Sequence, residues 1–227
     1  MKDEREHRNL LLGIIFLSVF IFQFSICLAH NDSIFMGTQV KLDIASPILI
    51  PAVNHWKVQH YEAAVNVRLA KRFYPTFELG YAGGSTDKGD TIFYNGHGGF
   101  FRLGCDLNPL KRHPEAPHAL LVGIRFGTSV QGANGVYLEA NGQMKEIKLW
   151  EKVTADCWGE IVAGCQVEVA QVQNTAFYMG WMGRFKILFT RSKGGKNAEE
   201  LKDIYIPGFG QRDNTAWGVN YYLGWRF

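Results

Sequence analysis

The sequence has few cysteines and almost no excess of basic over acidic residues, and each of these properties excludes a class of protein. Four cysteines in 227 residues are too few for a small domain held together by disulfides. A net charge of +3, from 24 basic and 21 acidic side chains, is too slight for a nucleic-acid binder. No convincing amphipathic helix follows residue 35, and no glycine run precedes a helix-forming segment that could bind phosphate at its N-terminus.

What the sequence has in abundance points to strands and turns. Nearly half of the residues (47%) are hydrophobic, which excludes intrinsic disorder and allows a full core. The chain contains 25 glycines together with 16 phenylalanines, nine tyrosines and six tryptophans, a combination typical of strands and tight turns.

The first residues resemble an export signal. A twenty-residue run from Leu10 to Ala29 is almost wholly apolar, and a charged stretch whose side chains sum to zero precedes it. Cys27-Leu28-Ala29 supplies a cleavage site before His30. We therefore predict a signal peptide over residues 1–29 and a mature domain over residues 30–227. Because the run is long enough to span a bilayer, an uncleaved anchor is the alternative.

From residue 35 onward the pattern has period 2, the period of a β-strand. Eight segments alternate in this way: 39–44, 60–70, 74–82, 99–107, 118–130, 156–169, 177–189 and 216–227. An even number of strands is what a single-chain bacterial membrane barrel requires.

The two faces of these strands differ sharply. One face carries large apolar side chains and no charge. The other is rich in glycine and carries thirteen charged residues: Lys41, Asp43, Glu62, Arg68, Glu78, Arg102, Asp106, Arg125, Glu160, Glu168, Arg184, Lys186 and Arg226. Because an eight-stranded barrel is only wide enough to be filled by side chains, charges and glycines suit its lumen and the large apolar residues suit lipid. The pattern predicts an all-β fold, an eight-stranded antiparallel transmembrane β-barrel with up-and-down meander topology. The alternative is a soluble, lipocalin-like barrel.

The connections between the predicted strands alternate in length. They span 45–59, 71–73, 83–98, 108–117, 131–155, 170–176 and 190–215, which is 15, 3, 16, 10, 25, 7 and 26 residues. Outer-membrane barrels have long extracellular loops and short periplasmic turns. We therefore expect both chain ends on the periplasmic side and mobile outer loops. On these strand directions, aromatic girdles should form from Tyr61, Tyr81, Phe101, Phe126 and Trp217 outside and from Phe177, Trp225 and Phe227 at the periplasmic rim.

The last strand carries a family resemblance. Apolar residues at alternate positions end in a terminal aromatic: Val219, Tyr221, Leu223, Trp225 and Phe227. This resembles the C-terminal signal read by the barrel-assembly machinery of Gram-negative outer membranes. The mature chain is similar to small eight-stranded barrels of the OmpA-barrel/OmpX type, and more closely to an uncharacterised outer-membrane barrel family of Bacteroidetes. Further motifs that carry this resemblance are Glu78-Leu-Gly-Tyr81, Phe101-Arg-Leu-Gly104, Val122-Gly-Ile-Arg-Phe-Gly127, Trp158-Gly-Glu-Ile-Val-Ala-Gly164 and Ile206-Pro-Gly-Phe-Gly210. The resemblance implies no catalytic residue.

Several residues could carry chemistry, but each has a simpler explanation. Cys105 and Cys165 fall on the apolar face, where cysteine serves as a small hydrophobic residue, and with Cys157 the mature count is odd. His113, Glu115 and His118 lie in one predicted turn and could together bind a metal ion. The two prolines of this segment indicate an ordinary exposed turn, which is the simpler interpretation. His97, Ser85, Asp87 and Asp90 share one predicted loop, but their spacing matches no catalytic motif. Arg191, Lys193 and Lys196 could touch lipopolysaccharide phosphates or could form an ordinary solvated loop.

We therefore expect a monomeric outer-membrane protein without catalytic residues, cofactor or metal, whose partners are membrane lipid, lipopolysaccharide and the barrel-assembly machinery. Its role would be structural or surface-binding. A lipid-modifying enzyme of the acyltransferase or deacylase type is the first alternative, and a barrel tethered by an uncleaved N-terminal helix is the second. The lumen arginines should reach Glu62, Glu78, Glu160 or Glu168 across adjacent strands, because isolated buried charges are costly. Such a lumen would be plugged, which excludes a general porin.

Overall fold

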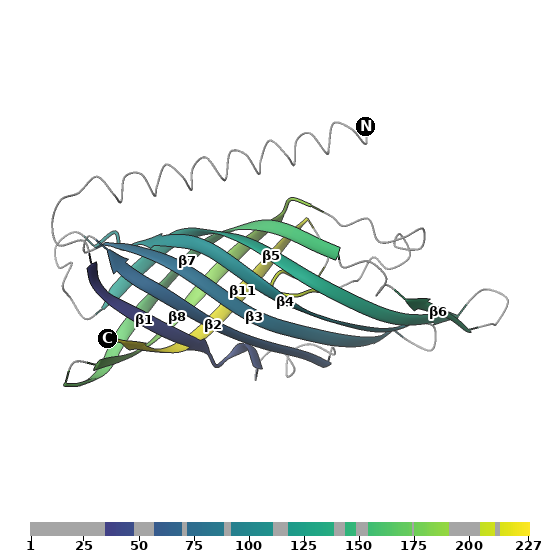
Figure 1. Cartoon of the computed structure of the whole chain (residues 1–227), viewed down its shortest axis with the longest axis horizontal. Coiled ribbons are helices and arrows are strands. Elements are labelled where there is room, and N and C mark those ends of the chain that lie inside the picture. Colours follow the sequence, from purple (N-terminus) through teal and green to yellow (C-terminus); the bar gives the residue numbers. More distant parts are fainter. Residues whose placement is uncertain are drawn as a thin grey trace.

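The computed structural model describes residues 35–47, 57–69, 72–88, 92–110, 118–138, 144–148, 154–173, 175–190, 205–211 and 214–227. These ranges contain eleven strands (Figure 1): β1 (Phe35–Asp43), β2 (Lys57–Leu69), β3 (Phe73–Lys88), β4 (Ile92–Leu107), β5 (Ala119–Leu138), β6 (Met144–Lys148), β7 (Thr154–Val172), β8 (Thr175–Leu188), β9 (Tyr205–Ile206), β10 (Gly210–Gln211) and β11 (Thr215–Arg226). The predicted signal peptide lies outside the described residues.

Eight of the strands close into an antiparallel barrel. The order is β1-β2-β3-β4-β5-β7-β8-β11, and β11 pairs with β1 to complete the circle. At this seam the backbones of Thr38 and Phe227 exchange two hydrogen bonds, of 3.2 and 2.9 Å. Gly37 adopts a φ of 126° beside them, and a Cβ there would lie 2.7 Å from the Phe227 carbonyl oxygen, so the closure needs glycine. The prediction of an eight-stranded antiparallel barrel is confirmed.

On one side of the barrel the strands run far beyond the predicted ends. The β3–β4 pairing continues to Lys88 and Ile92, and β5 continues to Leu138, where it pairs with β6. Figure 1 shows this extension at the end opposite the C-terminus. The predictions of long loops over 83–98 and 131–155 were therefore wrong in large part. Glycines such as Gly83, Gly84 and Gly96 interrupt the side-chain alternation there, but they do not interrupt the backbone ladder.

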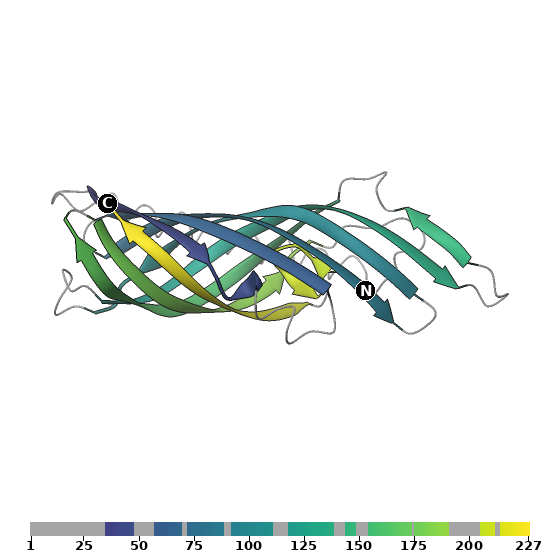
Figure 2. The same ribbon diagram turned by 90° about the horizontal axis from the view of Figure 1, so that it is seen from below.

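The predicted loop 190–215 was wrong in another way, because it contains the hairpin β9–β10. The two strands pair with each other in a separate sheet, joined by the turn Pro207-Gly208-Phe209. The three turn residues are buried, and Figure 2 shows the hairpin between the walls of the barrel. A sequence pattern of two-residue strands cannot be recognised by its period, so the hairpin could only be found in the folded chain.

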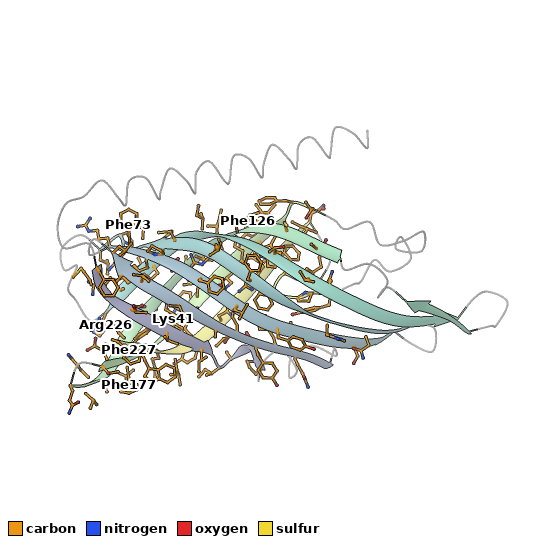
Figure 3. All side chains as sticks on the ribbon, viewed as in Figure 1. Lys41, Phe73, Phe126, Phe177, Arg226 and Phe227 are labelled. Atoms are coloured by element: carbon orange, nitrogen blue, oxygen red, sulfur yellow. The ribbon has the colours of Figure 1, made fainter. Side chains whose placement is uncertain are left out.

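The barrel wall is apolar outside and charged inside. Outward residues around the barrel, such as Leu79 on β3, Ile161 on β7 and Val219 on β11, are 58, 50 and 71% exposed. In Figure 3 the labelled Phe73, Phe177 and Phe227 lie at the end that holds the C-terminus. Cys105 departs from this scheme: it was predicted on the exposed apolar face but is buried, opposite Pro75 on β3 and Ile124 on β5.

Within the described ranges, no helix has both the length and the apolar character needed to cross a membrane.

Candidate functional site

The lumen is the candidate site, and its middle is filled by ion pairs. Arg102 on β4 places its guanidinium 2.8 Å from Glu62, 2.9 Å from Glu78 and 2.8 Å from Glu160. Arg184 on β8 reaches the same three carboxylates, at 3.1, 2.8 and 2.8 Å. All five side chains are at least nine-tenths buried. Two arginines thus share three glutamates in a water-poor layer.

A third arginine extends this layer toward the C-terminal end of the barrel. Arg125 on β5 donates to Glu78 at 3.0 Å and to Asp106 at 2.7 Å, and all three are buried. We call Glu62, Glu78, Arg102, Asp106, Arg125, Glu160 and Arg184 the central ion network. Its four carboxylates and three guanidiniums leave one negative charge, and the flanking Lys41, Asp43 and Lys186 make the sum neutral.

The ion pairs cross the lumen as well as linking neighbours. Glu78 and Arg102 lie on adjacent strands, as do Glu160 and Arg184. Arg184, however, also reaches Glu62 on β2 and Glu78 on β3, which are across the lumen from β8. The prediction that the arginines pair across adjacent strands was therefore too narrow. The interior of eight strands is small enough for a long guanidinium side chain to span it.

The remaining predicted lumen residues lie above and below the network. Lys41 places its ammonium over the ring of Tyr222, 4.6 Å from the centroid, and Arg68 lies 6.0 Å from the ring of Tyr74. Near the C-terminal end, the half-buried Arg226 donates to Glu168 at 3.0 Å. On β1, Asp43 accepts hydrogen bonds from Ser46 and Asn220. Ten of the thirteen predicted residues are buried, and Asp43, Glu168 and Arg226 are half-buried.

Large apolar and aromatic side chains also point inward, on the same face as the charges, although the sequence analysis expected charges and glycines to fill the lumen. One cluster of buried residues lies toward the C-terminal end and contains Tyr74, Leu121, Val162, Tyr178, Met182 and Tyr222. A second lies at the opposite mouth and contains Ala82, Phe100, Trp158, Leu188, Ile206 and Phe209. The lumen is therefore an ionic layer between two apolar layers.

Inward glycines explain how these rings fit. A Cβ on Gly80 would lie 2.1 Å from the ring of Phe100, and one on Gly127 would lie 2.3 Å from the indole of Trp158. Each glycine leaves the volume that a ring from another strand fills, which a pattern of single strands cannot reveal.

The hairpin β9–β10 closes the mouth above the ion network. The carbonyl oxygen of Gly208 accepts hydrogen bonds from Arg102 and from the Lys186 ammonium, both at 2.8 Å, and Lys186 also donates to the Phe209 carbonyl at 3.1 Å. Phe209 packs edge-on against Trp158, with ring centroids 5.9 Å apart. Burial raises the pKa of Tyr205 in the hairpin to about 12.

Among the buried polar residues that sequence reasoning did not assign to the lumen are an aspartate and a histidine. Asp156 is fully buried and accepts a hydrogen bond from Gln131 at 2.8 Å. His60 is buried and lies 3.2 Å from Glu62. Both were detectable, because Asp156 is in phase with Glu160 on β7 and His60 is in phase with Glu62 on β2.

One group of side chains has the ligand atoms of a metal site. Potential ligand atoms of Asp43, His60 and Glu62 lie within 4.8 Å of one another. Two guanidiniums already neutralise Glu62, however, at 2.8 Å from Arg102 and 3.1 Å from Arg184. A divalent cation there would have to displace or face these charges, so the arrangement fits an ion-pair network better than a metal centre.

The candidate catalytic and metal residues are not assembled into a site by the described chain. Ser85 and His97 lie on the paired strands β3 and β4, opposite Asn95 and Gly83 respectively, instead of in a shared loop. The side chain of Asp87 and all of Asp90, His113, Glu115, Arg191, Lys193 and Lys196 lie outside the described part. His118 is exposed, and Cys105, Cys157 and Cys165 are not joined in a disulfide within the described residues.

The aromatic residues predicted for the rims point outward in contacting pairs. Tyr61 and Tyr81 face each other in the β2–β3 register, and Trp217 packs on Phe185 with centroids 4.6 Å apart. At the C-terminal end, Phe177 packs edge-on against Trp225 at 6.3 Å. Their place at a membrane interface stays a prediction.

Comparison with known proteins gives a family without a described activity. The model of a family described as a domain of unknown function (DUF6048) matches residues 9–226. No curated protein matches the chain.

Proposed function

We propose that this chain, which belongs to the DUF6048 family, is an integral outer-membrane protein with a closed lumen and a structural or surface-binding role. The observation that carries this proposal is the inverted polarity of the barrel. Arg125 and Glu160 are fully buried in the lumen, whereas the outward Leu79, Trp181 and Val219 are 58, 50 and 71% exposed. Removing such apolar surface from water is favourable, and lipid offers that environment to every outward strand face.

Strand length supports the same proposal. A strand crosses the hydrocarbon core with about 9–11 residues when it is tilted. The barrel strands from β2 to β11 have 12–20 residues, and β1 has nine. All eight are therefore long enough to cross a bilayer, and closure leaves no unpaired edge inside it.

The orientation follows from the two ends of the barrel. The links at the end with Phe227 are 70–72 between β2 and β3, 108–118 between β4 and β5, and 173–174 between β7 and β8, and two of the three have at most three residues. The opposite end carries the extended β3–β6 strands and the plugging hairpin. Outer-membrane barrels place short turns in the periplasm, so the C-terminal end would be periplasmic and the extension extracellular, where it could meet lipopolysaccharide.

The role that fits this arrangement is non-enzymatic. The central ion network holds its carboxylates in pairs with arginines, so they are not available as bases. The alternate apolar residues from Val219 to Phe227 would serve the barrel-assembly machinery during biogenesis, and the closed seam suits a monomer. A lipid-modifying enzyme would instead require a histidine, a serine and an acid meeting at the outer rim.

A soluble, lipocalin-like barrel is less consistent with the side-chain distribution. Such a barrel binds its ligand in an apolar lumen and turns its charges outward. Here the middle of the lumen is the central ion network, while the outer face of β2 and β3 presents Tyr61, Val65, Phe77 and Leu79.

Cell fractionation with gel migration tests the proposal. The full-length protein should be found in the outer-membrane fraction and should migrate faster on a gel when it is not boiled, because a closed barrel stays compact in detergent. N-terminal sequencing of that band should begin at His30. A soluble protein would contradict the proposal and favour the soluble, lipocalin-like barrel. A band beginning at Met1 in the inner-membrane fraction would contradict it and favour the anchored alternative.

A further inference from the structure

The β9–β10 hairpin is a separate piece inside the mouth of the barrel. Its two strands pair with each other, and the wall closes through β1 and β11 without it. Because no ladder joins the hairpin to the described wall strands, it can leave without breaking the hydrogen bonds that close the barrel.

Side chains of the wall hold the hairpin in the manner of a bound ligand. Ile206 and Phe209 are almost completely buried against Phe100, Trp158 and Leu188. The two carbonyls of Gly208 and Phe209 face two cations, Arg102 and Lys186. Within the described part of the chain, the hydrogen bonds of the Lys186 ammonium go to these two carbonyls.

These contacts define the chemistry of the pocket under the hairpin. Its walls are aromatic and aliphatic, and its floor carries the Lys186 ammonium and the Nη2 of Arg102, whose Nη1 and Nε already face glutamates of the central ion network. The charge of an anion there would be met chiefly by Lys186. A carbonyl oxygen has only a partial charge, whereas a charged acceptor forms a stronger bond with such cations. An aromatic ring could take the place of Phe209, edge-on to Trp158.

We propose that the hairpin is a displaceable plug over a binding pocket for an aromatic anion. The ring of the ligand occupies the site of Phe209, and its anionic oxygens bind Lys186 and Arg102 in place of the two carbonyls. The central ion network below the pocket blocks further passage, so the site is a pocket and not a channel. This inference goes beyond the proposed function and does not depend on the membrane in which the barrel resides.

Two glycines of the hairpin provide a matched pair of variants. Gly208 has a φ of 76°, and a Cβ on it would lie 2.5 Å from Phe100. Gly210 has a φ of 120°, but a Cβ on it would meet no atom nearer than 3.9 Å. Both Gly208→Ala and Gly210→Ala strain the backbone, while only Gly208→Ala also pushes the hairpin away from the wall.

The test is calorimetric titration of phenyl phosphate into the purified full-length protein in detergent. We expect Gly208→Ala to bind at least tenfold more tightly than the wild type and Gly210→Ala, because its plug is loosened. The double variant Gly208→Ala/Lys186→Gln should bind phenyl phosphate at least tenfold more weakly than Gly208→Ala alone. Neutral phenol should bind Gly208→Ala more weakly than phenyl phosphate does. Fast migration on an unboiled gel checks that each variant is folded.

Phe209→Ala gives an independent route if Gly208→Ala does not fold, because it vacates the ring site without backbone strain. It should raise the affinity for phenyl phosphate in the same way. The proposal would be overturned if the folded Phe209→Ala and Gly208→Ala variants bound phenyl phosphate no more tightly than the wild type. It would also be overturned if Lys186→Gln left the affinity unchanged.

Discussion

At the scale of single residues, stability depends on how many partners a buried charge has. Glu160 is fully buried, 2.8 Å from Arg102 and 2.8 Å from Arg184, and its carboxylate also accepts a hydrogen bond from the Trp158 indole at 2.7 Å. Glu168 has the same chemistry but lies near the C-terminal rim, where its side chain is 14% exposed and Arg226 is 24% exposed. The two glutamates lie on the same strand and differ in their surroundings.

Glu160→Ala should lower the free energy of unfolding by roughly 3–5 kcal/mol, because two buried guanidiniums lose a shared carboxylate. Urea unfolding of the folded barrel in lipid vesicles, followed by tryptophan fluorescence, measures this change.

Glu168→Ala is the matched control, and it should cost at most about 1 kcal/mol because water can solvate Arg226. An unchanged unfolding midpoint for Glu160→Ala, or equal losses in the two variants, would mean that Glu160 is hydrated and that the lumen is not packed.

At the scale of the strand, the proposal that the outward faces contact lipid can be tested on β7. Ile161 is 50% exposed and lies near the middle of β7, beside Ile124 and Phe185. Ile161→Arg should lower the free energy of unfolding in lipid vesicles by about 2–4 kcal/mol, because a cation at the bilayer midplane loses its hydration. The measurement is the same urea titration.

Val172 supplies the control for depth. It is 59% exposed and is the last residue of β7, next to the turn. Val172→Arg should cost about 0–1 kcal/mol, since charges near the interface remain hydrated. If both arginines were tolerated equally, the outer face of the barrel would be in water and the soluble alternative would gain support.

At the scale of the whole molecule, two obstructions in series close the lumen. The hairpin fills the mouth with Ile206 and Phe209, and the central ion network fills the middle with Arg102, Arg125 and Arg184. A cavity of roughly 20 Å³ beside Lys41, Asn66 and Tyr222 is large enough for about one water molecule. Neither obstruction depends on the other to span the lumen.

The purified monomer should therefore show no large, stable conductance in a planar bilayer. Deletion of residues 205–211 should leave the conductance small, because the ion network still fills the narrow interior. A large, voltage-independent conductance from the intact monomer would refute the picture of a closed lumen, and one that appears only after the deletion would show that the hairpin alone closes it.

The period-2 pattern was sufficient to predict eight antiparallel barrel strands and the side toward which the residues of each strand point. These properties are local, because side chains alternate along a single strand whatever its partners are. Glu62, Arg102 and Arg184 could therefore be assigned to one face without knowledge of any contact. For the same reason Asp156 and His60 could have been assigned to it, because they begin the segments 156–169 and 60–70 in phase with Glu160 and Glu62.

The contacts of the inward residues, in contrast, depend on the folded barrel. Arg184 meets Glu62, which is 122 positions away in the chain, because strand tilt and stagger bring opposite walls to the same depth. The ring of Phe100 fits where Gly80 and Gly208 have no side chain, and Lys186 finds its acceptors in a hairpin that its own strand does not specify. Such matches depend on the register of all eight strands and on the fold of a long connection, and a pattern with period 2 carries no information about either.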